Sequence, residues 1–449
     1  MLRGPKGKIL LPSALLLGVL LYCGVVNAQS DSGSSKLDAQ GGFKLRSRRE
    51  NLYLGRVTSL ADSGPGTLRE CLVGSVPRVC IFEVGGIIDL KSDLTISKGR
   101  ITIAGQTAPS PGIVLRGATL SIESSDVVVE NISVWVGDSP HGPSAAYRDG
   151  VRIGSEKAKV RRVFLDHLSV LWGLDENVSV LGESSDITIQ NSLIAEGLEN
   201  SIHPKGPHSK GVLISPNSKR VSLIRNIIAF HGERLPLIQD GSSVFMLNNV
   251  VYGWGGPSRS SIIDISTNKS HKGVRLDLIG NVFLPAPWST SYPSVFAKPP
   301  SLLSRIYLRD NLGPTRSSSE QDEWKLVDLP QVPLRSNLPT FTNVSETVLT
   351  SGDVERELLN IVGSRPFKRS APDIRILASV AGRAGEIKDC ISKCTRNVGG
   401  WPRIGSSTRP KRKMVSFKNL SSTRFLRALR RYLREARQNL PVVRNGRFG

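Results

Sequence analysis

Aromatic residues are scarce in this chain: Phe, Trp and Tyr together make up 6% of its 449 residues. Glycine, by contrast, occurs 43 times, and the two facts together favour many short coils joined by tight turns. Long apolar runs are absent after residue 26, which excludes a helical membrane span from the remainder of the sequence. Histidine is absent from the neighbourhood of both cysteine pairs, which argues against a zinc site.

The apolar run at the N-terminus predicts a secretory signal peptide, residues 1–28. Three basic residues precede the run Ile9–Val26, and small residues end at Ala28, where we expect cleavage. An uncleaved membrane anchor is the alternative, although Pro12 and Gly18 interrupt the run. Residues 29–52 follow as a polar N-terminal segment. The sequence thus predicts a secreted, extracellular protein without stable membrane insertion.

Cysteine usage agrees with export. Cys23 lies within the predicted signal, and the remaining four cysteines are Cys71, Cys80, Cys390 and Cys394. An even number in a secreted chain predicts two disulfides. Of the three possible connectivities, pairing of Cys71 with Cys80 and of Cys390 with Cys394 is the simplest. Asn-X-Ser sequons also predict a glycoprotein, and they occur at Asn131, Asn177, Asn268, Asn343 and Asn419.

Acidic residues are few toward the C-terminus. The net charge is +22, and residues 401–449 contain 14 Lys and Arg against the single acid Glu435. A secreted basic protein favours polyanions such as acidic polysaccharides, and the signal peptide argues against nucleic acid as the partner.

A recurring motif runs through the middle of the chain. Alternating apolar residues precede a polar corner residue and a second apolar stretch, as in VVVENISV, VFLDHLSV and ITIQNSLI. The predicted corner residues are Asn131, His167, Asn191, Asn226, Asn249 and Asn281. Period-2 alternation predicts strands, and strands repeated at such spacing predict stacked coils. The Asn amides are expected to form a column that bonds backbone groups left free at the bend.

We therefore predict an all-β fold, a single-stranded right-handed parallel β-helix (a solenoid), over residues 53–404. The alternative is a β-sandwich with coincidental Asn at strand ends, but a sandwich has no reason to hold one period through six copies.

Residues 405–449 form a basic C-terminal tail with two interpretations. Apolar residues from Phe425 to Leu433 recur at helical intervals, which fits an amphipathic helix that binds an anionic surface, but a solvated basic tail fits equally well. The stretch Arg409–Arg412 resembles a dibasic processing site, so the tail is also a candidate propeptide. A similar RSRR ends at Arg49.

Several motifs, taken in order, resemble secreted pectate lyases of the parallel β-helix (pectin lyase-like) superfamily. They are VTSLADSGPGTLRE, FEVGGIIDL, ITIAGQTAP, VFLDHLSVLWGLDENVSV, HPKGPHSKGVL and VGGWP. The resemblance covers about residues 40–404. It implies cleavage of de-esterified pectin (polygalacturonate) by β-elimination, a reaction in which Ca²⁺ stabilises charge on the uronate carboxylate.

Carried over by position, the resemblance implies that Asp149 and Asp175 are calcium ligands, with Glu176 as a possible substitute. The family's further acid falls at Ser179, which leaves the calcium cage incomplete unless substrate carboxylates or Asp138 contribute.

The same resemblance assigns Arg234 as the base that removes the proton, although an arginine ordinarily stays protonated. It assigns Lys210 to substrate binding, with Lys205 as the nearby alternative. Gln239 stands where the family usually has a second arginine.

Each assignment has a plainer competitor. The acids can cap turns, Arg234 can pair with Glu233 on the surface, and Lys210 can be an ordinary solvated lysine. His167 is predicted to be an inward ladder residue beside Asp166. His203 and His208 are five residues apart on a loop, which is weak spacing for a metal pair.

The sequence thus predicts a monomeric, calcium-dependent polysaccharide lyase. One rival is a β-helix hydrolase, but the Asn-Thr-Asp and Gly-His-Gly motifs of polygalacturonases are absent. The other is a non-catalytic β-helix protein that binds acidic polysaccharide, which the residues at Ser179 and Gln239 favour.

Overall fold

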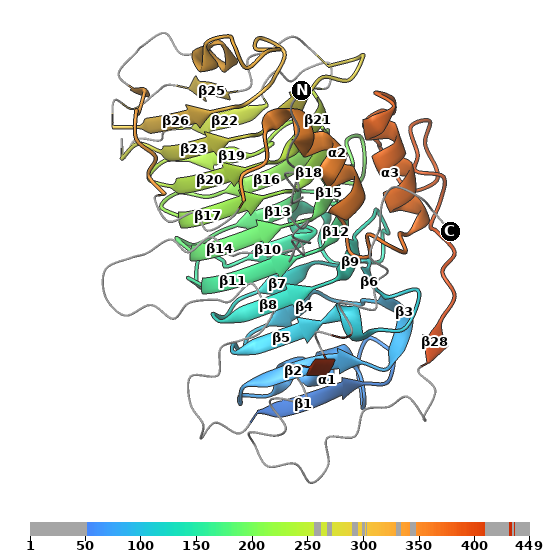
Figure 1. Cartoon of the computed structure of the whole chain (residues 1–449). Coiled ribbons are helices and arrows are strands. Elements are labelled where there is room, and N and C mark those ends of the chain that lie inside the picture. The colour runs from blue at the N-terminus through green and yellow to red at the C-terminus, as the bar shows by residue number, and fades with distance from the viewer. Residues whose placement is uncertain are drawn as a thin grey trace, which may run out of the picture.

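The structure is a computed structural model in which three sheets wind along one axis (Figure 1). It describes residues 52–255, 262–266, 272–289, 295–298, 301, 303–328, 334–341, 347–408, 431, 432 and 435. In chain order, each coil passes through the first sheet, then the third and then the second, and each strand pairs with its counterpart in the next coil. This is a parallel β-helix, as predicted.

The strands of the described residues are assigned to the sheets as follows. The first sheet contains β1 (Tyr53–Val57), β2 (Arg78–Phe82), β5 (Ile101–Ala104), β8 (Val127–Glu130), β11 (Arg161–Asp166), β14 (Ser185–Gln190), β17 (Lys219–Ile224), β20 (Ser243–Leu247), β23 (Arg275–Ile279) and β26 (Arg305–Arg309). The second contains β4 (Leu94–Ile96), β7 (Leu120–Ile122), β10 (Val151–Ile153), β13 (Glu176–Val180), β16 (Lys210–Ile214), β19 (Leu237–Gln239), β22 (Ile263–Ser266), β25 (Val295–Lys298) and β27 (Val327–Asp328). The third contains β3 (Val84–Asp89), β6 (Ile113–Arg116), β9 (Ile132–Trp135), β12 (Ser169–Leu171), β15 (Leu193–Ala195), β18 (Ile227–His231), β21 (Val250–Trp254), β24 (Val282–Leu284) and the antiparallel β28 (Ser407–Thr408).

Apolar side chains fill the interior because the strands alternate and the coils are in register. One column on the first sheet shows this: its members pair from coil to coil and all belong to the main core cluster. They are Val127, Val163, Ile187, Val221, Val244, Leu276 and Ile306. Each such side chain contributes about 1.5–3 kcal/mol on burial, so the core grows with every coil.

Polar residues at the bend between the first and third sheets form two adjacent columns. Asn131, His167 and Asn191 have φ near +50°, the left-handed region that a sharp turn requires. One residue later, Asn226, Asn249 and the two Asn of the following coils form the hydrogen-bonded ladder.

The ladder differs from the predicted column by one residue. Strand pairing sets Ser192, not Asn191, beside Asn226, so the predicted column mixed the bend position with the ladder position. Within the ladder, the Asn226 amide nitrogen donates to Asn249 Oδ1 at 3.1 Å. Asn249 donates likewise to Asn281 at 2.9 Å, and Asn281 to Asn311 at 3.0 Å.

His167 corrects a second prediction. It lies at the bend rather than inside the ladder, with 23% of its side chain exposed and Nδ1 2.9 Å from Asp166 Oδ1. The cause is the left-handed backbone at this position, which turns its side chain out of the alternation of the strand.

Short helical elements complete the fold. Helix α1 (Leu68–Val73) begins after the N-cap Thr67 and buries Leu68 and Leu72 against the first coils. The Cys71–Cys80 disulfide joins α1 to β2. The described residues also form the 3-10 turns η1 (Gly105–Thr107), η2 (Ala145–Tyr147) and η3 (Glu323–Leu326).

Helices α2 (Ser351–Ile361) and α3 (Ala371–Ala381) lie along the third sheet (Figure 1). Their buried faces, including Leu358 and Ile376, share one apolar cluster with Ile227 and Tyr252 of that sheet. The outer surface of the third sheet is therefore a second core.

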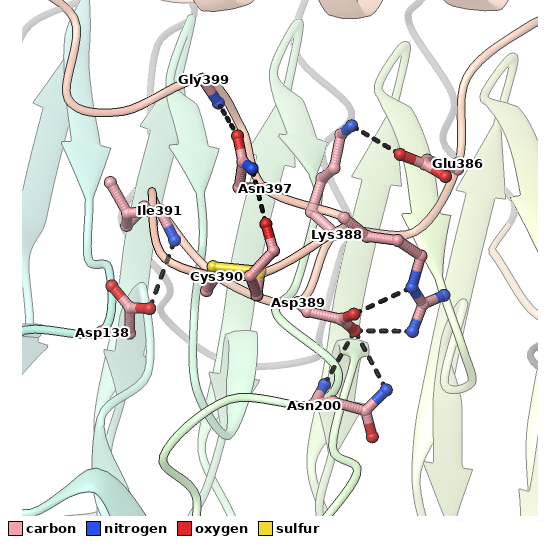
Figure 2. The surroundings of a disulfide bond; sticks show 11 residues. Asp138, Asn200, Glu386, Lys388, Asp389, Cys390, Ile391, Asn397 and Gly399 are labelled. Carbon is pink, nitrogen blue, oxygen red and sulfur yellow. Dashed lines mark hydrogen bonds and ion pairs between the residues drawn. A yellow bond between two sulfur atoms is a disulfide. The ribbon is translucent and has the colours of Figure 1, made fainter.

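The segment after α3 returns across the coils and contains the Cys390–Cys394 disulfide (Figure 2). Asp389 accepts hydrogen bonds from the backbone and side chain of Asn200, both at 3.1 Å. Asp138 accepts from the Ile391 backbone nitrogen at 3.2 Å. These contacts fasten the segment to two separate coils. Both predicted disulfides are present.

Two predicted sequons are buried in this fold. Asn131 is 5% exposed and donates to the Ser364 carbonyl, and Asn177 is fully buried and donates to the Ala195 carbonyl. Neither side chain can carry a glycan in the folded chain. The sequons at 268, 343 and 419 lie outside the described residues, as do the predicted signal peptide and most of the basic tail. No helix among the described residues is long and apolar enough to span a membrane.

Candidate active site

The predicted site residues come from four consecutive coils at the edge of the second sheet. Glu176 opens β13 and pairs with Lys210, which opens β16. Asp149 lies two residues before Val151, which pairs with Val178, so Asp149 is opposite Glu176. Lys210 is bridged to Glu233, the neighbour of Arg234. Coil spacing of about 4.8 Å therefore brings together residues that are far apart in sequence.

Three carboxylates converge here. Asp149, Asp175 and Glu176 each offer an oxygen within 4.8 Å of the others. Asp149 and Glu176 are each 3% exposed. Ser179 stands where the family pattern has a further acid. Its Oγ donates to Asp149 Oδ2 at 2.6 Å, so Ser179 binds a carboxylate instead of adding one.

Charge repulsion among these acids is strong. Burial, together with Asp149 and Asp175, raises the pKa of Glu176 to about 8. Burial also raises the pKa of Asp149. A cation placed among the three would relieve this cost, and three hard oxygen donors in one place suit Ca²⁺.

Two predicted cations adjoin the acids. The Arg234 guanidinium donates to Glu176 Oε1, and the Arg234 backbone is in the left-handed region with φ of 63°. Lys210 Nζ contacts His208 and lies 3.5 Å from Asp175 Oδ1. Burial and the neighbouring Arg234 lower the pKa of Lys210. Lys210 is 7% exposed, so it is not an ordinary solvated lysine.

His203 and His208, dismissed on sequence spacing, lie together in the fold. Their rings stack with centroids 3.5 Å apart and planes 14° from parallel, and both offer a nitrogen near Asp175. Each nitrogen lone pair lies in its ring plane, so two nearly parallel stacked rings cannot both direct one at a single ion. The pair is better understood as a support for Asp175.

Asp175 is the acid that this support keeps ionised. His208 Nε2 lies 2.9 Å from its Oδ1. Burial favours the neutral acid, but the His208 hydrogen bond and Lys210 outweigh it and lower the pKa of Asp175 to about 2.

An open cleft surrounds these groups. Its lining consists of Tyr147, Asp149, Arg152, Asp175, Glu176, Ser179, Leu181, Lys205, Lys210, Leu213 and Arg234. The lining includes Arg234, Lys210 and Lys205, as well as the three acids. Lys205 is exposed at the rim. The exposed Tyr147 is the aromatic residue of the lining.

Arg152 is a charged cleft residue that sequence reasoning missed. Its Nε donates to Asp149 Oδ2 at 3.0 Å, and the side chain is 17% exposed. The signal was present in the motif RDGVRI, because Val151 and Ile153 face the core and the residue between them must face outward.

Two residues considered in the sequence lie elsewhere. Gln239 ends β19 and is not part of the cleft lining. Asp138 contacts the returning C-terminal segment (Figure 2) and is not among the three clustered acids.

Comparison with known proteins gives a consistent result. The chain is 39% identical over 255 residues to a probable pectate lyase C of Neosartorya fischeri, covering 57% of this chain and 53% of that protein. It is 37% identical over 279 residues to a probable pectate lyase C of Aspergillus terreus, covering 61% and 60%. The chain thus spans about half the length of the first of these curated relatives. No family model matches.

Solved structures give weaker matches. A cedar pollen major allergen, jun a 1, has a TM-score of 0.49 at 19% identity, covering 70% of this chain and 89% of that one. A pectate lyase from Bacillus sp. N165, solved in complex with trigalacturonate, has a TM-score of 0.45 at 12% identity, covering 66% and 88%. On the sequence similarity to these fungal proteins, the predicted resemblance to pectate lyases is confirmed.

Proposed function

We propose that the chain is a secreted pectate lyase that cleaves de-esterified polygalacturonate by β-elimination. The observation that carries the proposal is the cleft, where three carboxylates and four cations meet on consecutive coils. Similarity to pectate lyases supports the same reaction class.

The reaction needs a base and positive charge. A base removes the proton from C5 of a galacturonate, and the C5 electron pair forms the C4–C5 double bond. The C4–O bond breaks with its electron pair going to the glycosidic oxygen, which takes a proton from water. The proton is acidic only because the adjacent carboxylate can take up charge, so cations near that carboxylate accelerate the step.

In this proposal the Arg234 guanidine, after losing one proton to solvent, removes the C5 proton. Its contact with Glu176 and its left-handed backbone fix its position at the cleft. Lys210 binds a uronate carboxylate, and the exposed Lys205 binds another at the rim. Such lysine–carboxylate pairs orient the polymer so that C5 faces Arg234.

The acids fit a calcium ion in donor chemistry, because they are oxygen ligands within 4.8 Å of one another. We propose that Asp149, Asp175 and Glu176 hold Ca²⁺, which when bound supplies positive charge toward the substrate carboxylate. Ser179 adds only a hydroxyl, so substrate oxygens are expected to complete the coordination.

We further propose that residues 1–28 direct secretion, that residues 53–404 form the catalytic domain of a monomer, and that the basic tail 405–449 increases attraction to the anionic polymer. The excess of 13 positive charges over residues 401–449 supports the last assignment.

One assay tests the reaction. Purified protein is incubated with polygalacturonate, with Ca²⁺ or with chelator, while ultraviolet absorbance of the unsaturated product is followed. We expect absorbance that depends on Ca²⁺. New reducing ends without absorbance would indicate a hydrolase. If neither product forms, the chain is the non-catalytic binding protein.

A further inference from the structure

Arg152 forms a hydrogen bond with Asp149, one of the three acids that we assign as calcium ligands. Its Nε donates to Asp149 Oδ2 at 3.0 Å, and its Nη2 donates to the Tyr147 carbonyl. Arg152 pairs with Ser179 across β10 and β13, so both side chains rise on the same face beside Asp149. Asp149 Oδ2 therefore already has two donors.

A guanidinium and a calcium ion compete for the same oxygen. The Arg152 guanidinium lies between the carboxylates of Asp149 and Asp93, which favour its charged form, so it does not release Asp149 by losing a proton. Arg152 must move away, or the ion must share the carboxylate with a nearby positive charge. Either event lowers the affinity for a divalent cation.

The structure also supplies a place for Arg152 to go. Its Nη1 lies 3.7 Å from Asp93 Oδ2, and Asp93 is on the loop before β4, outside the acid cluster. A small rotation of the guanidinium toward Asp93 would exchange one carboxylate partner for another. Asp93 is therefore expected to favour release of Asp149.

We propose that Arg152 is a positioning residue that competes with Ca²⁺ for Asp149 and so sets the calcium affinity of the cleft, with Asp93 as its alternative partner. The proposal rests on the assignment of Asp149, Asp175 and Glu176 as calcium ligands under the proposed function.

The test measures calcium binding directly. Calcium is titrated by calorimetry into the full-length chain and into Arg152→Gln, Arg152→Lys and Asp93→Asn. Arg152→Gln is expected to bind Ca²⁺ about tenfold more tightly, the lower end of what one charge at this distance does to a carboxylate. The calcium affinity of Arg152→Lys should lie between those of the unaltered chain and Arg152→Gln. Asp93→Asn should bind Ca²⁺ more weakly than the unaltered chain.

A matched control is Arg162→Gln, which removes a half-buried arginine paired with Asp126 on the outer surface of the next coil. It should leave calcium affinity unchanged. Melting temperatures identify any variant that fails to fold. If Arg152→Gln does not fold, the calcium affinity of Arg152→Lys still tests the proposal.

Equal or weaker binding by folded Arg152→Gln, or calcium binding by none of the proteins, would overturn the proposal. The lyase assay on polygalacturonate is scored separately. Activity without the affinity change would refute only the role of Arg152, whereas the affinity change without activity would refute only the proposed reaction.

Discussion

At the scale of single residues, each acid of the cleft has a cation of its own. Arg152 is paired with Asp149, and Arg234 with Glu176. Asp175 contacts both Lys210 and His208. Each acid thus has a partner within the cleft, and basic residues outnumber acids in the lining.

Arg234 should be required for catalysis but not for folding. We expect Arg234→Ala to lower kcat/KM on polygalacturonate by at least about 100-fold, as for loss of a general base. The measurement is the initial rate of ultraviolet absorbance, together with the melting temperature.

Arg225→Ala is the matched control. Arg225 also has a left-handed backbone, with φ of 53°, and its NH2 donates to the Thr347 carbonyl far from the cleft. It should retain full activity. An active, folded Arg234→Ala would remove Arg234 from the mechanism.

At the scale of elements, period-2 alternation was sufficient to predict the strands and the β-helix, because apolar columns form whenever coils stack in register. The same reasoning misplaced the ladder by one residue. Asn is favoured both in a left-handed bend and in a hydrogen-bonded column, so Asn191 and Asn226 look alike in sequence although they occupy neighbouring positions.

The site shows a similar limit. Motif matching located Asp149, Asp175, Arg234 and Lys210 in one cleft, since the family pattern carries their spacing. It could not show that His203 and His208 stack, because that depends on the path of one loop. It also did not identify Arg152, because the role of this side chain depends on Asp149 of the same coil and Ser179 of the next.

The ladder should contribute to stability independently of the cleft. Asn249 is fully buried, accepts from Asn226 and donates to the Leu223 carbonyl and to Asn281. Asn249→Ala leaves several buried groups unpaired, so we expect a loss of about 2–4 kcal/mol in the free energy of unfolding.

Urea denaturation followed by circular dichroism measures that loss. The control is Asn360→Ala on the exposed face of α2, which should change stability by less than about 0.5 kcal/mol. Equal effects of the two substitutions would show that the ladder does not support the fold.

At the scale of the whole molecule, the C-terminal third determines how the solenoid is covered. Helix α3 is fastened to the third sheet by Asp373, whose Oδ2 accepts from Ser169 Oγ at 2.8 Å. Asp373 is fully buried, and its Oδ1 has no hydrogen-bond partner among the described residues. A charged group is thus enclosed between the helix and the coils.

This enclosure should make global stability depend on pH. Burial raises the pKa of Asp373 from 3.8 to about 6, against the opposing hydrogen bonds from Ser169 and Ser370. Because the folded pKa is the higher one, the folded chain holds this proton more tightly. The associated stability is present below pH 3.8 and is lost as pH rises to about 6, a loss of about 3 kcal/mol.

Asp373→Asn removes the titrating group while keeping the shape of the side chain. The free energies of unfolding of the unaltered chain and of Asp373→Asn are measured in urea from pH 4 to pH 7.5. The variant should gain stability relative to the unaltered chain up to pH 6, and the difference should then stay constant. The matched control is Asp353→Asn in the first turn of α2, where Thr350 and Arg356 lower the pKa of Asp353. Its titration therefore lies below this pH range, and its difference should stay nearly constant. A difference for Asp373→Asn that does not vary with pH would mean that Asp373 reaches water, and that α3 is not closed over the sheet at this point.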